Sequence, residues 1–201
     1  MSGIIAQNSG RHTGLVKASS GGGGVWNLIL TQTASSSAAL SFTSGLDSTY
    51  DEYIFTFINL HPETDDRGLM VGFRDGGSDY DAIKTTSKFR AYHAEADDAA
   101  VLSYDSDYDL AQATGFQQFD DDIGNDNDQS LSGHMHLFAP SDTTFVKHFI
   151  AETQSIRAND YTVHTFIAGY CNVTAAIDGV QFKMRTGNMD AGDICLYGIS
   201  S

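Results

Sequence analysis

The chain is dominated by short segments rich in β-branched and aromatic residues, which recur every 8–15 residues. Almost nothing between them has a helical pattern, so the parallel strand–helix–strand units of α/β proteins are excluded. The pattern predicts an all-β protein, a β-sandwich or jelly roll, over residues 25–201. The expected strands cover residues 25–31, 38–43, 53–60, 69–75, 88–94, 99–104, 133–139, 144–152, 161–170, 180–186 and 194–200.

Two segments carry more specific expectations. In residues 53–60, YIFTFINL, both faces of the strand are nearly apolar, which indicates a central strand. In residues 105–113, DSDYDLAQA, an Asp or Ser in a capping position predicts one or two helical turns.

Residues 1–24 are expected to form an extended N-terminal arm. Two apolar pairs, Ile4-Ile5 and Leu15-Val16, lie among Gly, Ser and polar residues, and four consecutive glycines follow at 21–24. A run of glycines has little conformational preference and acts as a hinge. The predicted organisation is therefore an arm with a glycine hinge, followed by one sandwich domain.

Charge is distributed unevenly along the chain. The net charge of −15 argues against a nucleic-acid partner, because phosphate binding needs clustered Lys and Arg. Residues 1–46 contain Arg11 and Lys17 but no acid, whereas residues 91–142 contain 12 acids and no Lys or Arg. We expect the arm to dock on an acidic surface, such as that of a neighbouring copy, through Ile4, Ile5, Arg11, Leu15, Val16 and Lys17.

The sequence shows neither a membrane-spanning run nor a secretory signal. No stretch of 18 apolar residues is present, and the first residues lack a basic region followed by an apolar one. We therefore expect no membrane insertion and synthesis in a reducing cytoplasm. Cys171 and Cys195 have no metal-binding spacing, and free, buried thiols are the favoured interpretation over a disulfide.

The acidic stretch FDDDIGNDND, residues 119–128, is the first candidate for a metal site. An EF-hand loop needs Gly at its sixth position and an acid at its twelfth, and neither register of this stretch provides them. A calcium site without that motif would use Asp120, Asp122, Asp126 and Asp128. The favoured interpretation is a polar, outward-facing loop, with no cofactor.

Catalytic signals are missing from the sequence. Five crowded Asp residues do not suggest a carboxylate pair with separated pKa values, and no nucleophile elbow, phosphate loop or zinc-protease motif is present. His134 and His136 lie two apart and share one face of a strand, and with His148 and His164 they are interpreted as solvent-face or interface residues rather than metal ligands. The tyrosines and Trp26 are interpreted as packing residues rather than a sugar platform. We expect no enzymatic activity.

Three stretches resemble structural proteins of tailed bacteriophages, especially those of aquatic bacteria. They are MSGIIAQNSGRHTGLVKA at the start, SFTSGLDSTYDEYIFTFINLHP at 41–62 and GVQFKMRTGNMDAGDICLYGIS at 179–200. The middle of the chain, which includes the acidic stretch, takes no part in the resemblance. The likeness contains no catalytic motif, so it implies no active-site residues.

The resemblance implies a jelly-roll-like component of a virion. The favoured interpretation is a non-enzymatic capsid decoration protein, which attaches through its arm and forms a homo-oligomer, a trimer by preference, with other virion proteins. It would be assembled in the host cytoplasm. The alternative is a tail-fibre or receptor-binding head that contacts a host glycan or protein. A second alternative is a free carbohydrate-binding module.

Overall fold

A computed structural model describes residues 24–120 and 122–200, which form twelve strands. Eleven of them coincide with segments expected from the sequence, although several are longer or shifted by a few residues. β7, only two residues long, was not expected. The strands are β1 (Val25–Thr33), β2 (Leu40–Phe42), β3 (Glu52–Pro62), β4 (Leu69–Arg74), β5 (Lys84–Ala94), β6 (Ala100–Tyr104), β7 (Gln117–Gln118), β8 (Leu131–Phe138), β9 (Lys147–Ile156), β10 (Tyr161–Cys171), β11 (Gly179–Met184) and β12 (Met189–Ser200).

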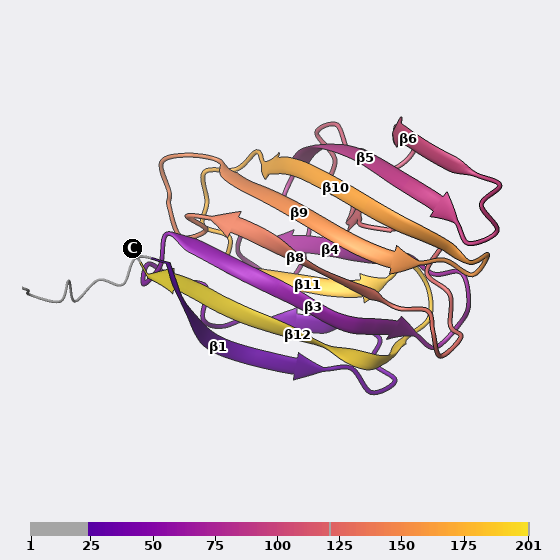
Figure 1. The fold of residues 1–201 in the computed structure, drawn as a ribbon. Coiled ribbons are helices and arrows are strands. Elements are labelled where there is room, and N and C mark those ends of the chain that lie inside the picture. The colour runs from indigo at the N-terminus through magenta and orange to yellow at the C-terminus, as the bar shows by residue number, and fades with distance from the viewer. Residues whose placement is uncertain (1–23, 121, 201) are drawn as a thin grey trace, which may run out of the picture.

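The strands form two antiparallel sheets of unequal width. The larger sheet has eight strands in the order β1-β12-β3-β8-β9-β10-β5-β6, and the smaller has four in the order β2-β11-β4-β7. Figure 1 shows the smaller sheet behind the middle of the larger one. The β-sandwich expected from the sequence is confirmed.

The core lies between the two sheets and is rich in phenylalanine. Phe182 of the smaller sheet packs against Phe55 and Phe57 of β3, with ring centroids 5.3 and 5.2 Å apart. Phe42 of β2 packs edge-on against Phe55 at 5.2 Å. Because buried aromatic side chains contribute large apolar areas, this cluster fixes how the sheets stack. β3 lies between β12 and β8 in the larger sheet, which confirms the expected central strand.

Residues 105–113 do not form the helical turns expected from the sequence. The segment instead runs along β5, where the Thr86 N–H donates to Leu110 O and the Lys84 N–H donates to Ala113 O, each at 2.9 Å. Pairing with an open strand edge satisfies backbone groups that a single helical turn would leave free.

Three lysines on the larger sheet point inward and are fully buried: Lys84, Lys88 and Lys147. The Lys147 ammonium donates to the carbonyls of Phe145 and Thr174, each at 2.9 Å, in the loops at one end of the sandwich. Burial of an ammonium group without hydrogen-bond acceptors would be costly, so each buried lysine needs polar partners within the protein. Burial also lowers the pKa of Lys147.

The remaining expectations on organisation divide into two groups. Residues 1–23 lie outside the described residues, so the expected arm and its contact residues are not part of the structure described here. Cys171 and Cys195 are both free and buried, as expected. None of the described residues belongs to a helix long and apolar enough to cross a membrane.

Candidate functional site

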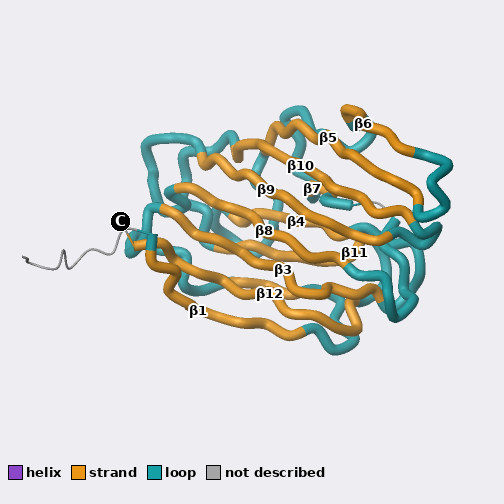
Figure 2. The backbone as a smooth tube through the Cα atoms, in the orientation of Figure 1, coloured by secondary structure: helices purple, strands orange, loops and turns teal. Residues whose placement is uncertain are grey.

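The face of the larger sheet that points away from the core is open and carries several exposed apolar residues beside polar ones. We call this surface, formed by the outward-pointing residues of the eight strands, the outer face. Figure 2 shows the backbone of the strands that form it. Successive strand residues point to opposite sides of a sheet, so half of each strand contributes to it. Its exposed large apolar residues are Trp26, Leu28, Ile58, Phe89, Leu102, Tyr104 and Ile150.

One cross-strand row runs across the whole outer face because the registers of all eight strands align. Phe89 of β5 lies opposite Tyr104 on one side and Phe166 of β10 on the other. The rings of Phe89 and Phe166 are stacked, with centroids 4.9 Å apart and planes 13° apart. Phe166 in turn lies opposite Glu152 of β9, where the row becomes polar. The row continues across the face through His134, Thr56, Cys195 and Thr31.

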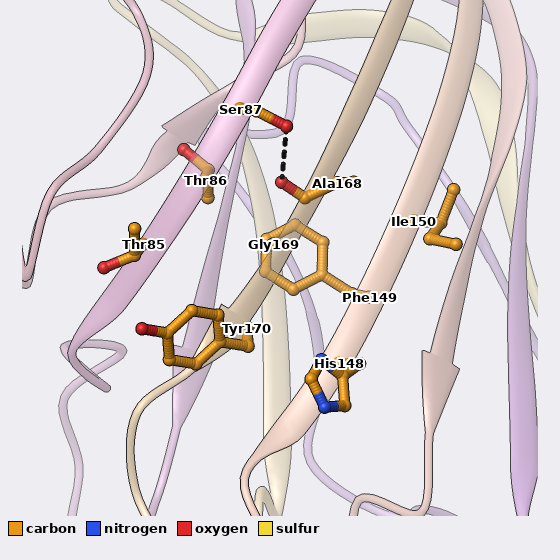
Figure 3. A pocket seen from close by; sticks show the side chains of 9 residues that line it. All are labelled: Thr85, Thr86, Ser87, His148, Phe149, Ile150, Ala168, Gly169 and Tyr170. Atoms are coloured by element: carbon orange, nitrogen blue, oxygen red, sulfur yellow. Dashed lines mark hydrogen bonds between the residues drawn. The ribbon is translucent and has the colours of Figure 1, made fainter.

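Beside the aromatic row, small residues leave a shallow hollow of about 520 Å³. Ser87 of β5 and Ala168 of β10 lie opposite each other. They form the row next to that of Phe89 and Phe166, and their side chains are much smaller. Figure 3 shows Tyr170, His148 and Ile150 around this low point. The hydroxyl of Ser87 donates to Ala168 O at 3.4 Å. The hollow therefore combines an apolar floor with hydroxyl and imidazole groups at its rim.

Histidines and glutamates form a connected line in the middle of the outer face. His136 Nδ1 lies 2.5 Å from Glu52 Oε1, and His164 Nε2 lies 2.7 Å from Glu152 Oε1. His134 lies opposite Glu152, with its ring 5.1 Å from that of His136. Burial, followed by the neighbouring His136, lowers the pKa of His134, and Glu152 opposes the effect. The prediction that His134 and His136 share a face is confirmed.

Charged side chains are scarce on the outer face. Lys and Arg are absent from its outward strand positions in the described chain, because Lys84, Lys88 and Lys147 all point inward. The carboxylates of Glu52 and Glu152 are bonded to histidines, as described above, and that of Asp193 accepts a hydrogen bond from Thr33 Oγ1 at 2.5 Å. Depletion of free charge is a feature of the central part of protein–protein interfaces.

The acidic stretch differs from the outward-facing loop expected from the sequence. Some of its described residues are buried: Asp120 is 1% exposed and Ile123 is fully covered. Arg157 Nη2 lies 3.7 Å from Asp120 Oδ1, and Arg157 Nη1 lies 3.3 Å from Asp122 Oδ2. Residues 125–128, which include Asp126 and Asp128, are exposed. The expectation of a polar, outward-facing loop was therefore wrong for Asp120 and Ile123, because Ile123 is buried and Arg157 pairs with Asp120, whereas residues 125–128 face outward.

The calcium candidates do not converge on one point. Asp120 and Asp122 are held by Arg157, and Asp126 and Asp128 lie among the exposed residues 125–128. Within the described part of the chain, no group of three or more His, Cys, Asp or Glu side chains is arranged to hold a metal ion.

Several outer-face residues were not singled out from the sequence. Phe89, Phe166 and Ile150 lie in segments whose strand character was expected, but alternation alone does not say which side a second sheet will cover. The sequence of β5 offered no such signal, because a face with Lys84, Lys88 and Arg90 would be expected to point to solvent, whereas both lysines are buried and Phe89 is exposed. Of the aromatic residues expected to be packing residues, Tyr50 packs against Tyr53 and Tyr92 stacks on Tyr161, whereas Trp26 and Tyr104 are exposed on the outer face.

Comparisons with known proteins add little to this description. No protein-family model matches the chain, and no curated protein matches it. Among solved structures, a Bacteroides ovatus protein described as a structural genomics target of unknown function aligns with 5% sequence identity and a TM-score of 0.27. The alignment covers 50% of this chain and 44% of that one.

Proposed function

We propose that this chain is a non-enzymatic structural protein of a bacteriophage virion, a capsid decoration protein that attaches through residues 1–24. The proposal is supported by the resemblance of residues 1–18, 41–62 and 179–200 to phage structural proteins. The structural observation that supports the proposal is the open outer face, which is eight strands wide, carries exposed apolar residues and has no Lys or Arg at its described outward strand positions.

The outer face suits a protein partner better than bulk solvent. Large apolar side chains exposed together on one face of a protein often mark an interaction site. Trp26 is 51% exposed and Ile150 is also 51% exposed, although the chain has 26 acids with which to cover its surface. These acids lie mainly in loops, so the sequence keeps the protein soluble while leaving one face free for contact.

Attachment is tested on intact particles of the phage that encodes the chain. An antibody raised against residues 25–201 is expected to label the capsid of purified particles in electron microscopy. Deletion of residues 2–24 is expected to remove the label while the truncated protein still folds, which its unfolding transition would show. Unlabelled wild-type particles would contradict a virion role, and full labelling by the truncated protein would contradict attachment through the arm.

The hollow beside Tyr170 favours a second candidate function, a receptor-binding head that contacts a host-surface glycan. Sugar rings present an apolar face and a hydroxyl rim, and the hollow offers an apolar floor near Ala168 with Ser87 and His148 beside it. Under this proposal a glycan array probed with the full chain shows binding that is lost in Tyr170→Ala. Tyr80→Ala, a tyrosine substitution outside the hollow, is the matched control. An array without signal, or equal loss in both variants, would contradict it.

A further inference from the structure

β6 (Ala100–Tyr104) is an unprotected edge of the larger sheet. It is the last strand in the sheet order and pairs only with β5. Its side chains are exposed on both faces: Leu102 is 74% exposed, Tyr104 57% and Val101 40%. Figure 1 shows β6 at the corner of the molecule farthest from β1. Exposed apolar edge strands readily accept a further strand unless the protein blocks them.

The register shows which backbone groups of β6 are available. The Ala94 N–H donates to Ala99 O, and the Asp105 N–H donates to Lys88 O, each at 2.9 Å. In an antiparallel pair, residues alternate between bonding toward the partner strand and pointing away from it. The N–H and C=O groups of Ala100, Leu102 and Tyr104 therefore point away from β5. No other strand in the described chain lies on that side.

Acids surround this edge. Glu95, Asp97 and Asp98 precede β6 and are exposed, and Asp107 follows it and is also exposed. The edge thus has an apolar centre, Val101 and Leu102, between two acidic ends. A strand that complements it needs an apolar centre between basic ends, and it should carry no acid.

One segment of the chain has this composition. Residues 11–17, RHTGLVK, place Leu15 and Val16 between Arg11 and Lys17, and residues 1–46 contain no acid. We propose that residues 11–17 of one copy add to β6 of a second copy as an extra strand, a contact that rests on the proposed role of residues 1–24 in attachment. Addition of an extended segment to a sheet edge is a common mode of peptide recognition.

Chain length requires the contact to join two different copies. β1 and β6 are at opposite edges of the eight-stranded sheet, seven strand spacings apart, or about 34 Å. From Lys17 to the start of β1 at Val25, the chain spans about 29 Å even when fully extended. Residues 11–17 therefore cannot reach β6 of their own copy. Such a head-to-tail contact closes into a ring or continues as a chain of subunits.

The first test measures self-association of the full chain by analytical ultracentrifugation. The double variant R11E/K17E is expected to weaken association roughly tenfold, because two attractive charges become repulsive. The control K183E/R185E makes the same change of net charge at the end of β11 and just after it, and is expected to associate like the wild type. Equal association of all three proteins, or a wild type that stays monomeric at all concentrations, would overturn the proposal.

A proline at Leu102 tests the edge itself. The Leu102 N–H points away from β5, so Leu102→Pro removes a donor for the incoming strand and keeps the β5–β6 bonds. We expect loss of association with an unfolding midpoint close to that of the wild type. A folded Leu102→Pro protein that associates normally would overturn the proposal.

A cross-linking experiment covers the case in which Leu102→Pro fails to fold. Leu15→Cys and Ala100→Cys are made in separate chains. The native Cys171 and Cys195 are buried, so they should not form the cross-link. Oxidation of the mixture is expected to give a disulfide-linked mixed dimer, whereas either protein alone gives little product. No mixed dimer would overturn the inference without affecting the virion role if the wild type still labels particles. If mixed dimers form but the wild-type protein is absent from purified particles, the virion role is overturned and the contact between copies stands.

Discussion

Arg157 forms an ion pair with Asp120 of the acidic stretch, and the carboxylate of Asp120 is almost entirely buried. Arg157 Nη2 is 3.7 Å from Asp120 Oδ1, and Ser155 Oγ donates a hydrogen bond to the other carboxylate oxygen. Asp120 is 1% exposed and Arg157 is 7% exposed. The most acidic part of the sequence is therefore anchored to β9 and the turn after it.

Replacement of Asp120 is expected to destabilise the protein strongly. Asp120→Ala leaves Ser155 without its acceptor and removes one of the carboxylates facing Arg157, and breaking a buried ion pair typically costs about 3–5 kcal/mol. The exposed Asp128→Ala, in the same stretch, is expected to change the free energy of unfolding by less than about 0.5 kcal/mol. Urea unfolding measures both. Similar values for the two variants would show that the pair does not anchor the loop.

The buried Cys171 thiol is expected to make stability depend on alkaline pH. Cys171 lies opposite Lys84 and Lys147 in the sheet, and burial raises its pKa to about 12 from 9.0. Above pH 9 the unfolded chain therefore loses the thiol proton while the folded chain keeps it. This contribution to stability is complete below pH 9 and is lost at up to about 1.4 kcal/mol per pH unit as the pH rises toward 12.

The variant Cys171→Ala isolates that contribution. Lys84 and Lys147 have lowered pKa values and act in the opposite direction, so the informative quantity is the difference between wild type and variant at each pH. Urea unfolding is expected to show a difference that is constant at neutral pH and shrinks above pH 9. If the difference in free energy of unfolding between wild type and variant is the same at every pH, the prediction that burial raises the pKa of Cys171 is wrong.

His134 is expected to lower stability in mild acid. Its pKa is reduced below 6.5 by burial and by His136, so the unfolded chain takes up the proton first as the pH falls. Stability is therefore lost as the pH drops through 6.5 toward the folded value. In His134→Gln this loss should be smaller, measured by unfolding at about pH 7 and about pH 5. His148→Gln, on the same face, controls for the substitution, and identical losses in both variants would exclude His134 as the cause.

Two glycines with the same backbone angle are expected to respond differently to alanine. Gly76 and Gly192 both have a φ of +105°, a region that costs a side chain about 1 kcal/mol or more. A Cβ at Gly192 would lie 2.4 Å from Asn59 O, where the registers of β12 and β3 both shift, whereas nothing lies within 4 Å of one at Gly76.

Gly192→Ala should therefore lose more stability than Gly76→Ala, by about 1–3 kcal/mol, the typical cost of overpacking. Thermal unfolding of both variants makes the comparison. If the two variants lose equal stability, the cost of alanine comes from the backbone angle alone, and the nearby backbone of β3 does not contribute to it.

The strands were predictable because alternation and β-branched composition act locally. β3 illustrates this, since its apolar residues on both faces correctly indicated a central position. Residues 105–113 illustrate the limit, because a local capping signal was overruled by pairing with β5. The acidic stretch was misjudged for a similar reason: its partner, Arg157, is far away in the sequence.

The sequence by itself determined that the protein is all-β, a sandwich or jelly roll, since its strands recur at short spacing and no helical segments separate them. Only the tertiary structure decided which face of each strand is covered. β5 shows why. Alternation places Phe89 and Lys88 on opposite faces of the strand, but it does not say which face is covered. The residue that is buried is the one on the side of the smaller sheet and Asp105. Lys88 Nζ lies 3.1 Å from Asp105 Oδ2 inside the protein, so the lysine is accommodated there and the phenylalanine remains on the outer face.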